Sequence, residues 1–402
     1  MIRPLLPQNY IIRQGTIFED FENISQWPKM SGDGTVSAET SYKMCGSQSL
    51  RLNVTTAGSF IIARRTYTTA QDFREAGKVI HIWIRPLTSP STIQAMIFTL
   101  FDTIATKYFS YTPSGTDFLP NQWNHIVLHR NNWANTGGAS WGNINAFQIK
   151  LTAASGQTAS VCVDMCIYSQ EQTPRCVIMF DDACNDAYTK AFAYMNPRGL
   201  KGTIFVVPTL VGTSGYCTLA QLEEMHEAGW TIANHTYNHP GGPLYLTGYS
   251  YNQIVDEIGS CTEWLISHGF TRGAYHLAYP GGYYNNDVFA AMDALGIKTG
   301  RSTLSLRLQN APVDNYKILM SKALDSALTL STAKSLWIDR AISWGQTAFL
   351  HGHKLEAAAG VNTWSISDFR SMIDYIVARR LKCVTIDEWY QGLTNPRYQA
   401  VL

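Results

Sequence analysis

The spacing of apolar residues changes character partway along the chain. Apolar residues occupy alternate positions in four early runs, at 50–54, 80–84, 147–151 and 161–167. A period of two is typical of antiparallel strands with one buried face. Breaks rich in Gly, Asn and Ser separate the runs. This pattern predicts an all-β sandwich over residues 1–172.

Beyond a polar segment that ends in proline, short apolar strands alternate with amphipathic helices. The first strand is Cys176–Phe180, and the last is expected over Cys383–Ile386. Capping boxes at Thr218 and Ser250 mark the first turns of two of the helices. About seven or eight βα units predict a distorted (β/α) barrel over residues 173–402.

Composition excludes two classes of partner. Lys and Arg number 31 against 30 for Asp and Glu, a net charge of +1, so no polyanion-binding surface and no nucleic-acid partner are expected. No apolar run reaches the roughly 18 residues of a membrane span, and the N-terminus lacks the apolar stretch of a signal peptide. The eight cysteines form no CxxC cluster, which leaves their redox state open.

Residues of metal-binding type follow three of the predicted barrel strands. They are Asp181 with Asp182, His235 with His239, and His351 with His353. The carboxyl ends of parallel barrel strands share one face, so these groups can converge. Two imidazoles and one carboxylate make a three-ligand site with open positions, as in catalytic metal centres. An isolated H-x-x-x-H or Asp-Asp pair is weak evidence, but their joint placement favours a metal site.

These residues resemble the motifs of the polysaccharide deacetylase family, the NodB-homology domains of carbohydrate esterase family 4. The matching segments are Phe180-Asp181-Asp182-Ala183, with Ala where Gly is usual, His235–His239, Tyr279–Asn285 and Phe349-Leu350-His351. The resemblance implies that Asp182, His235 and His239 bind a divalent metal, commonly zinc and sometimes another ion. It also implies Asp181 as general base and His351 as general acid in removing acetyl groups from an N- or O-acetylated polysaccharide.

The chain departs from the family pattern at three places. The third motif lacks its arginine, for which Arg301 is a candidate substitute and a surface arginine the alternative. The fourth motif, whose aspartate partners the catalytic histidine, has no clear match, and Asp314 is the only candidate. His353 would point the same way as His351 on a strand, so either could be the acid, with the family register favouring His351.

The segment around Tyr279 would contribute to substrate or oxyanion binding. In the family resemblance, a backbone N–H near Gly281 would help to hold the tetrahedral oxyanion. Tyr279, Arg301 and His353 are further candidates for contact with the substrate.

The N-terminal half more weakly resembles the galactose-binding-like jelly-roll of carbohydrate-binding modules, through Gly46–Leu52 and the strand with Asp164. It would bind the glycan or form a homo-oligomer. Two other functions stay open: a glycan-binding protein without catalysis, and an amidohydrolase of small cyclic amides. The substrate implies an extracellular or cell-surface site of action, yet no signal peptide is seen, so a virion protein such as a phage tail enzyme is also considered.

Overall fold

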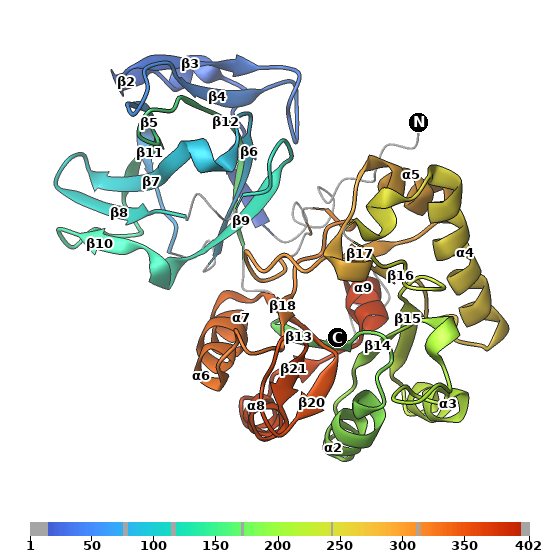
Figure 1. The fold of residues 1–402 in the computed structure, drawn as a ribbon. Coiled ribbons are helices and arrows are strands. Elements are labelled where there is room, and N and C mark those ends of the chain that lie inside the picture. Colours follow the sequence, from blue (N-terminus) through green and yellow to red (C-terminus); the bar gives the residue numbers. More distant parts are fainter. Residues whose placement is uncertain are drawn as a thin grey trace. The chain divides into compact units, whose positions relative to one another are not determined.

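A computed structural model gives the fold of most of the chain. It describes residues 15–74, 79–113, 118–169, 173–242, 244–310, 313 and 315–394. These fall into two compact units, one ending at Ser169 and the other starting at Thr173, with Val313 assigned to the first (Figure 1). The predicted boundary at residue 172 and the candidate Asp314 lie outside the described residues.

The N-terminal unit consists of two antiparallel sheets. The first has the strand order β3-β4-β12-β6-β9 with β1 beside β12, and the second has the order β10-β8-β7-β11-β5-β2. The strands are β1 (Gly15–Glu19), β2 (Lys29–Gly32), β3 (Gly34–Glu39), β4 (Ser49–Val54), β5 (Phe60–Gln71), β6 (Val79–Pro86), β7 (Ile93–Thr103), β8 (Lys107–Tyr111), β9 (Asn124–His129), β10 (Ala134–Thr136), β11 (Ile144–Ala153) and β12 (Ala159–Ser169).

Alternate residues of these strands form the core of the sandwich. Leu50 and Leu52 on β4 and Phe147 and Ile149 on β11 are fully buried in one cluster. Strand β6 departs from the expected alternation, because His81 on its other face is buried as well. The predicted all-β sandwich is confirmed.

The C-terminal unit is built on a parallel sheet of eight strands. Their order is β17-β16-β15-β14-β13-β19-β18, and β22 pairs with β13. The strands are β13 (Arg175–Phe180), β14 (Thr203–Val206), β15 (Thr231–Asn234), β16 (Gly273–Ala278), β17 (Thr299–Arg301), β18 (Lys322–Ala323), β19 (Thr347–Gly352) and β22 (Lys382–Cys383). A parallel bridge between Arg301 and Leu319 joins β17 to the segment that leads into β18. The sheet therefore curls round on itself, and the predicted distorted barrel is confirmed.

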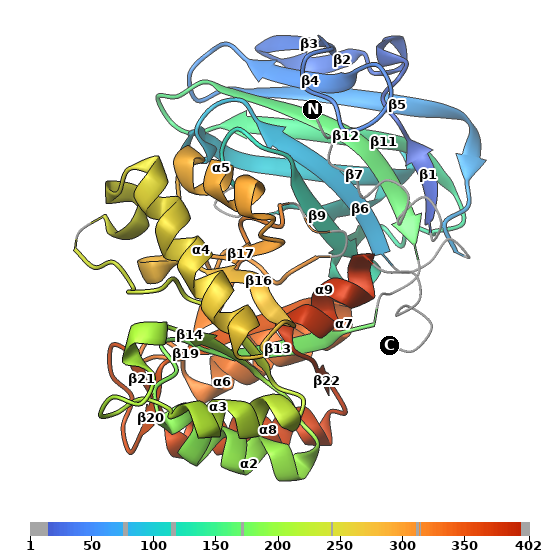
Figure 2. The ribbon, with the colours of Figure 1, turned by 90° about the vertical axis from the view of Figure 1, so that its right-hand side faces the viewer.

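Helices lie outside this sheet. They are α2 (Ala193–Met195), α3 (Leu219–Glu227), α4 (Tyr251–Ser267), α5 (Asn286–Leu295), α6 (Leu330–Thr332), α7 (Arg340–Trp344), α8 (Ile366–Ala378) and α9 (Ile386–Thr394). Figure 2 shows α2, α3 and α8 gathered along one side of the strands. The capping box at Thr218 forms as predicted: the Thr218 side chain accepts from the Gln221 N–H, and Gln221 Oε1 accepts from the Thr218 N–H. Within the described ranges, no helix combines the length and apolar character required to cross a membrane.

The predicted strand Cys383–Ile386 is wrong beyond its first residue. Pairing with β13 stops at Cys383, and α9 begins at Ile386. The side chain of Glu388 accepts a bond from the Thr385 N–H, and Thr385 Oγ1 accepts one from the Glu388 N–H. This Thr-x-x-Glu capping box starts a helix, and it outweighs the apolar β-branched character of the segment.

Gly300 on β17 is required by close packing at the point where the barrel closes. A Cβ there would lie 1.9 Å from the Tyr279 hydroxyl oxygen and 2.9 Å from the Lys317 carbonyl oxygen. We expect Gly300→Ala to lower the free energy of unfolding by about 1–3 kcal/mol, because β17 must shift to admit the methyl group.

Urea unfolding followed by circular dichroism measures this loss. Gly259→Ala on α4 is the matched control, since its Cβ would meet only Leu295 Cδ2 at 3.5 Å, and helix propensity there favours Ala by about 0.5–1 kcal/mol. Equal stability of the two variants would contradict the prediction.

Candidate functional site

The H-x-x-x-H segment directly follows β15 and is held by its own polar side chains. The Asn234 amide donates to two oxygens of α4, the Ile258 carbonyl and the Thr262 hydroxyl. Its oxygen accepts from the Thr236 N–H at 2.8 Å, and Thr236 Oγ1 accepts from the His239 N–H at 3.2 Å. Thr236 and His239 both have positive φ angles, 65° and 53°. This tight turn brings the two imidazoles to the same side of the strand end.

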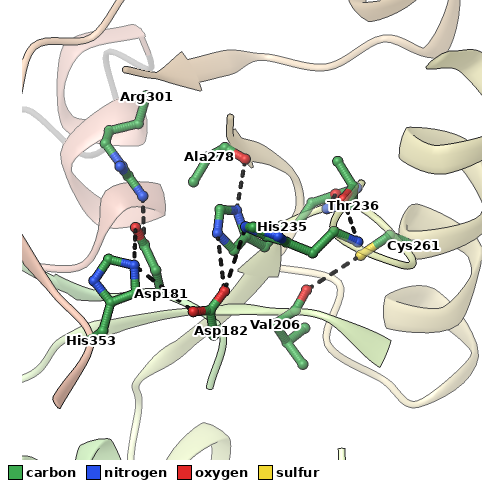
Figure 3. Close-up of polar contacts among 11 residues, drawn as sticks. Asp181, Asp182, Val206, His235, Thr236, Cys261, Ala278, Arg301 and His353 are labelled. Atoms are coloured by element: carbon green, nitrogen blue, oxygen red, sulfur yellow. Dashed lines mark hydrogen bonds and ion pairs between the residues drawn. The ribbon is translucent and has the colours of Figure 1, made fainter. Parts of the chain in front are cut away.

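Asp182, His235 and His239 form a cluster with the spacing of a metal site. Their ligand atoms lie within 4.8 Å of one another. Oδ1 of Asp182 is 3.5 Å from Nε2 of His235 and 3.7 Å from Nε2 of His239. Nδ1 of His235 lies 2.9 Å from the Ala278 carbonyl oxygen (Figure 3). Since a carbonyl only accepts, Nδ1 carries the proton and Nε2 keeps its lone pair for a ligand.

The chemistry of this cluster fits a divalent metal. Oδ1 of Asp182 is buried and accepts no hydrogen bond from the described residues, and an orphaned carboxylate oxygen is costly without a cation. Burial lowers the pKa of His235 to about 4 against the opposing effect of Asp181 and Asp182, so its ring is in the neutral, ligating form at pH 7. One carboxylate and two imidazoles suit Zn²⁺ and other borderline divalent ions.

Asp181 points to the other side of the strand end and is paired with Arg301. The guanidinium donates from Nη2 to Oδ1 of Asp181, and both side chains are buried. Burial alone would raise the pKa of Asp181, but the charge of Arg301 and the neighbouring imidazoles together outweigh it and hold that pKa well below its usual range. The Arg301 guanidinium also lies over the Phe205 ring, 5.4 Å from its centroid. The alternative of a solvated surface arginine at position 301 is wrong.

His351 and His353 line the same cavity but differ in exposure. His351 on β19 is 2% exposed, and its Nδ1 lies 2.8 Å from the hydroxyl of Ser321. Burial, aided by the positive charge of Arg301, lowers its pKa to about 3. The His353 side chain is 26% exposed, with Nε2 3.8 Å from Oδ2 of Asp182 and 4.0 Å from Oδ2 of Asp181. The geometry thus places one buried and one accessible imidazole beside the acidic pair.

All nine residues that the sequence singled out line one cavity of about 500 Å³ at the carboxyl ends of the strands. They are Asp181, Asp182, His235, His239, Tyr279, Gly281, Arg301, His351 and His353. Tyr279 lines the cavity. Its hydroxyl donates a hydrogen bond to the Lys317 carbonyl oxygen at 2.7 Å. The sequence missed other lining residues, among them Tyr245, Thr303 and, on the two-residue strand β18, Lys322, because no motif or period marks residues on connections and elements this short.

Two tyrosines form an aromatic wall beside the histidines. The rings of Tyr245 and Tyr283 stack with centroids 5.3 Å apart and planes 20° apart. Tyr245 also meets His239 edge-on at 6.1 Å. A Cβ on Gly281 would lie 2.5 Å from the Tyr245 ring, so glycine is required there for the wall to form. Tyr283 is 48% exposed and offers a flat face at the site.

Comparison with known proteins gives relatives for part of the chain. YxkH of Bacillus subtilis (strain 168), named provisionally as a polysaccharide deacetylase, is 30% identical over 138 residues, 34% of this chain and 48% of that protein. The poly-beta-1,6-N-acetyl-D-glucosamine N-deacetylase of Staphylococcus epidermidis is 28% identical over 151 residues, 35% of this chain and 52% of that protein. The chain therefore spans about half the length of the curated relatives it matches.

The solved structure of a carbohydrate-binding module is also similar to part of the chain. The family 11 carbohydrate-binding module of Clostridium thermocellum, in complex with a beta-1,3-1,4-mixed-linked tetrasaccharide, aligns at 11% identity with a TM-score of 0.31. The alignment covers 39% of this chain and 96% of that chain.

The fold and the cavity define the C-terminal unit as a (β/α)-barrel domain with its polar cluster at the carboxyl ends of the strands, where such barrels hold their catalytic groups. The family model for polysaccharide deacetylase matches residues 169–300. This part of the chain is therefore similar to polysaccharide deacetylases, the family whose motifs the sequence resembles.

Removing the carboxylate of Asp182, which lies near both imidazoles, tests the metal cluster directly. We expect Asp182→Ala to abolish stoichiometric binding of Zn²⁺, because two imidazoles alone do not make a tight site. Titration calorimetry with Zn²⁺ and elemental analysis of the purified protein measure the loss. Asp256→Asn, which neutralises an exposed carboxylate on α4, is the control and should bind Zn²⁺ like the wild type. Unchanged affinity in Asp182→Ala would refute the site.

Proposed function

We propose that the C-terminal unit is a metal-dependent deacetylase that removes acetyl groups from an N- or O-acetylated polysaccharide. The observation that carries the proposal is the convergence, in one cavity, of the Asp182-His235-His239 cluster with a separate carboxylate and a buried imidazole. Similarity to the deacetylase family supports the same class of reaction.

Asp182, His235 and His239 would hold the metal, most simply Zn²⁺ from the donor set. A bound metal would supply Lewis acidity, making a water molecule more acidic and an acetyl carbonyl more electrophilic. Asp181 is the general base that removes a proton from the attacking water. Arg301 occupies Oδ1 of Asp181, which leaves Oδ2 for this proton and fixes the direction in which the carboxylate faces.

His351 delivers a proton to the departing amine or alcohol, and a backbone N–H near Gly281 contributes to the oxyanion site. Both residues line the cavity that contains Asp181. His353 stays a second candidate for the acid, since its Nε2 lies as near as 4.0 Å to Asp181. Comparing His351→Ala with His353→Ala separates the two assignments.

The substrate we propose is a neutral, acetylated hexosamine polymer. The similar protein from Staphylococcus epidermidis is named for N-deacetylation of poly-beta-1,6-N-acetyl-D-glucosamine, and flat tyrosine faces suit pyranose rings. The N-terminal sandwich would bind the same glycan and raise its local concentration, or pair two copies of the chain. We further propose that the protein acts on an extracellular or cell-surface glycan and that it does so as part of a virion.

Acetate release tests the function. Wild-type protein loaded with Zn²⁺ should release acetate from at least one of several acetylated polymers: poly-N-acetylglucosamine, chitin oligomers, peptidoglycan and acetylxylan. Asp181→Asn should keep bound Zn²⁺ but lose about 10²–10⁴-fold in kcat, the usual worth of a general base.

The control for that experiment is the metal content of each variant, measured in the same preparations. Wild-type protein that holds Zn²⁺ but releases no acetate from any polymer would favour the glycan-binding alternative. Full turnover by Asp181→Asn would remove the proposed base.

The aromatic wall gives a separate prediction about the substrate. Tyr283→Ala should raise KM for acetylated oligosaccharides about 2- to 10-fold with kcat nearly unchanged, since stacking is worth roughly 0.5–1.5 kcal/mol. Tyr251→Ala, an exposed tyrosine at the first turn of α4, is the matched control. An unchanged KM in Tyr283→Ala would exclude this wall as a sugar subsite.

A further inference from the structure

The partner of His351 is a hydroxyl group. Nδ1 of His351 lies 2.8 Å from Oγ of Ser321, and both side chains are buried. The same Oγ donates to the Ser302 carbonyl oxygen, also at 2.8 Å. The described residues show no hydrogen bond or ion pair between His351 and a carboxylate.

These two contacts determine which ring nitrogen carries the proton. A carbonyl oxygen can only accept, and a serine hydroxyl has a single proton. With that proton on the Ser302 carbonyl, Oγ must accept from His351, so Nδ1 carries the hydrogen. Nε2 is then the nitrogen with the free lone pair, and it is the one left to act in the cavity that His351 lines.

Backbone pairing holds Ser321 firmly in this position. Its N–H donates to the Leu304 carbonyl oxygen at 2.8 Å, and the adjoining β18 pairs in parallel with β19. Ala323 on β18 is the register partner of His351, whose carbonyl accepts from the Leu324 N–H at 2.7 Å. Backbone pairing therefore fixes the main chain of both Ser321 and His351, one on the segment that leads into β18 and the other on β19.

We propose that Ser321 is a positioning residue, which holds His351 in its Nδ1–H form so that Nε2 faces the leaving group. The proposal rests on the deacetylase function put forward above. It concerns one step of that reaction, the protonation of the leaving atom. A neutral hydroxyl orients the ring as a carboxylate would but stabilises the imidazolium less, and burial already disfavours that cation.

The proton balance of the step is as follows. Water loses one proton to Oδ2 of Asp181 as its oxygen bonds to the acetyl carbon. His351 takes a proton from solvent on Nε2 and gives it to the leaving nitrogen or oxygen. At the same time the bond between that leaving atom and the acetyl carbon breaks, and the bonding electron pair stays on the leaving atom. The ring returns to the neutral Nδ1–H form, acetic acid ionises, and Asp181 releases its proton to solvent.

The test compares two substrates whose leaving groups differ in how much they need a proton. With an N-acetylated oligosaccharide, Ser321→Ala should lower kcat about 10- to 100-fold with KM unchanged, a fraction of the full worth of an acid. With 4-nitrophenyl acetate, whose phenolate leaves without protonation, kcat should fall less than about 3-fold. Ser321→Thr, which keeps the hydroxyl, should restore most of the loss.

Ser302→Ala is the matched control. Its hydroxyl is buried and donates to the Leu319 carbonyl oxygen, but the contact to Ser321 uses only its main chain. This variant should change the ratio of the two activities less than 3-fold. Equal losses on both substrates in Ser321→Ala, or no loss on either, would overturn the proposal.

A readout without substrate separates this inference from the function itself. In ¹⁵N-histidine NMR spectra of the full chain, His351 should show the Nδ1–H tautomer in the wild type and a shift toward Nε2–H in Ser321→Ala. An Nε2–H tautomer in the wild type would refute the role of Ser321, even if acetate is released. The expected tautomer without any acetate release would refute only the function.

Discussion

The buried ion pair between Asp181 and Arg301 is the interaction on which the arrangement of the site depends. It connects the end of β13 with the end of β17, which lie on different sides of the curled sheet and 120 residues apart in the chain. Both side chains are buried, so loss of one partner leaves the other charge buried and uncompensated, at a cost of about 3–5 kcal/mol. The pair thereby fixes which way the carboxylate faces.

Around this pair, the strand ends carry a second layer of polar contacts. Asn234 and Thr236 bond to the main chain of the histidine turn, and the Ala278 carbonyl orients His235. Such outer contacts set the tautomer and direction of each ligand. Asp182 itself has a left-handed backbone, with φ at 63°. Strain of this kind persists only where neighbouring contacts enforce it.

The two imidazoles at the end of β19 show how burial separates similar groups. His351 is enclosed and bound to a neutral hydroxyl, whereas His353 is a quarter exposed and faces the two carboxylates. Desolvation lowers the pKa of His351. The end of one barrel strand therefore presents two histidines of unlike exposure within one cavity.

Much of this could be predicted from the chain alone. Period-two alternation at residues such as Leu50 and Leu52 gave the sandwich, and alternating strands and capped helices gave the barrel, because local burial patterns repeat along each element. The metal cluster was also predictable, since parallel strands present their carboxyl ends on one face. The Thr385–Glu388 capping box was visible in the sequence too, and an apolar run obscured it.

What the sequence determined by itself is the set of groups that follow each strand, and with it the family that the chain resembles and the kind of site. Only the tertiary structure decided the partners of those groups. Arg301 could have been a surface residue, and the partner of His351 was sought among aspartates, whereas it is Ser321. The physical reason is that the curled sheet brings β17 beside the segment that leads into β18, a contact that no local pattern encodes, and this contact selects which side chains meet.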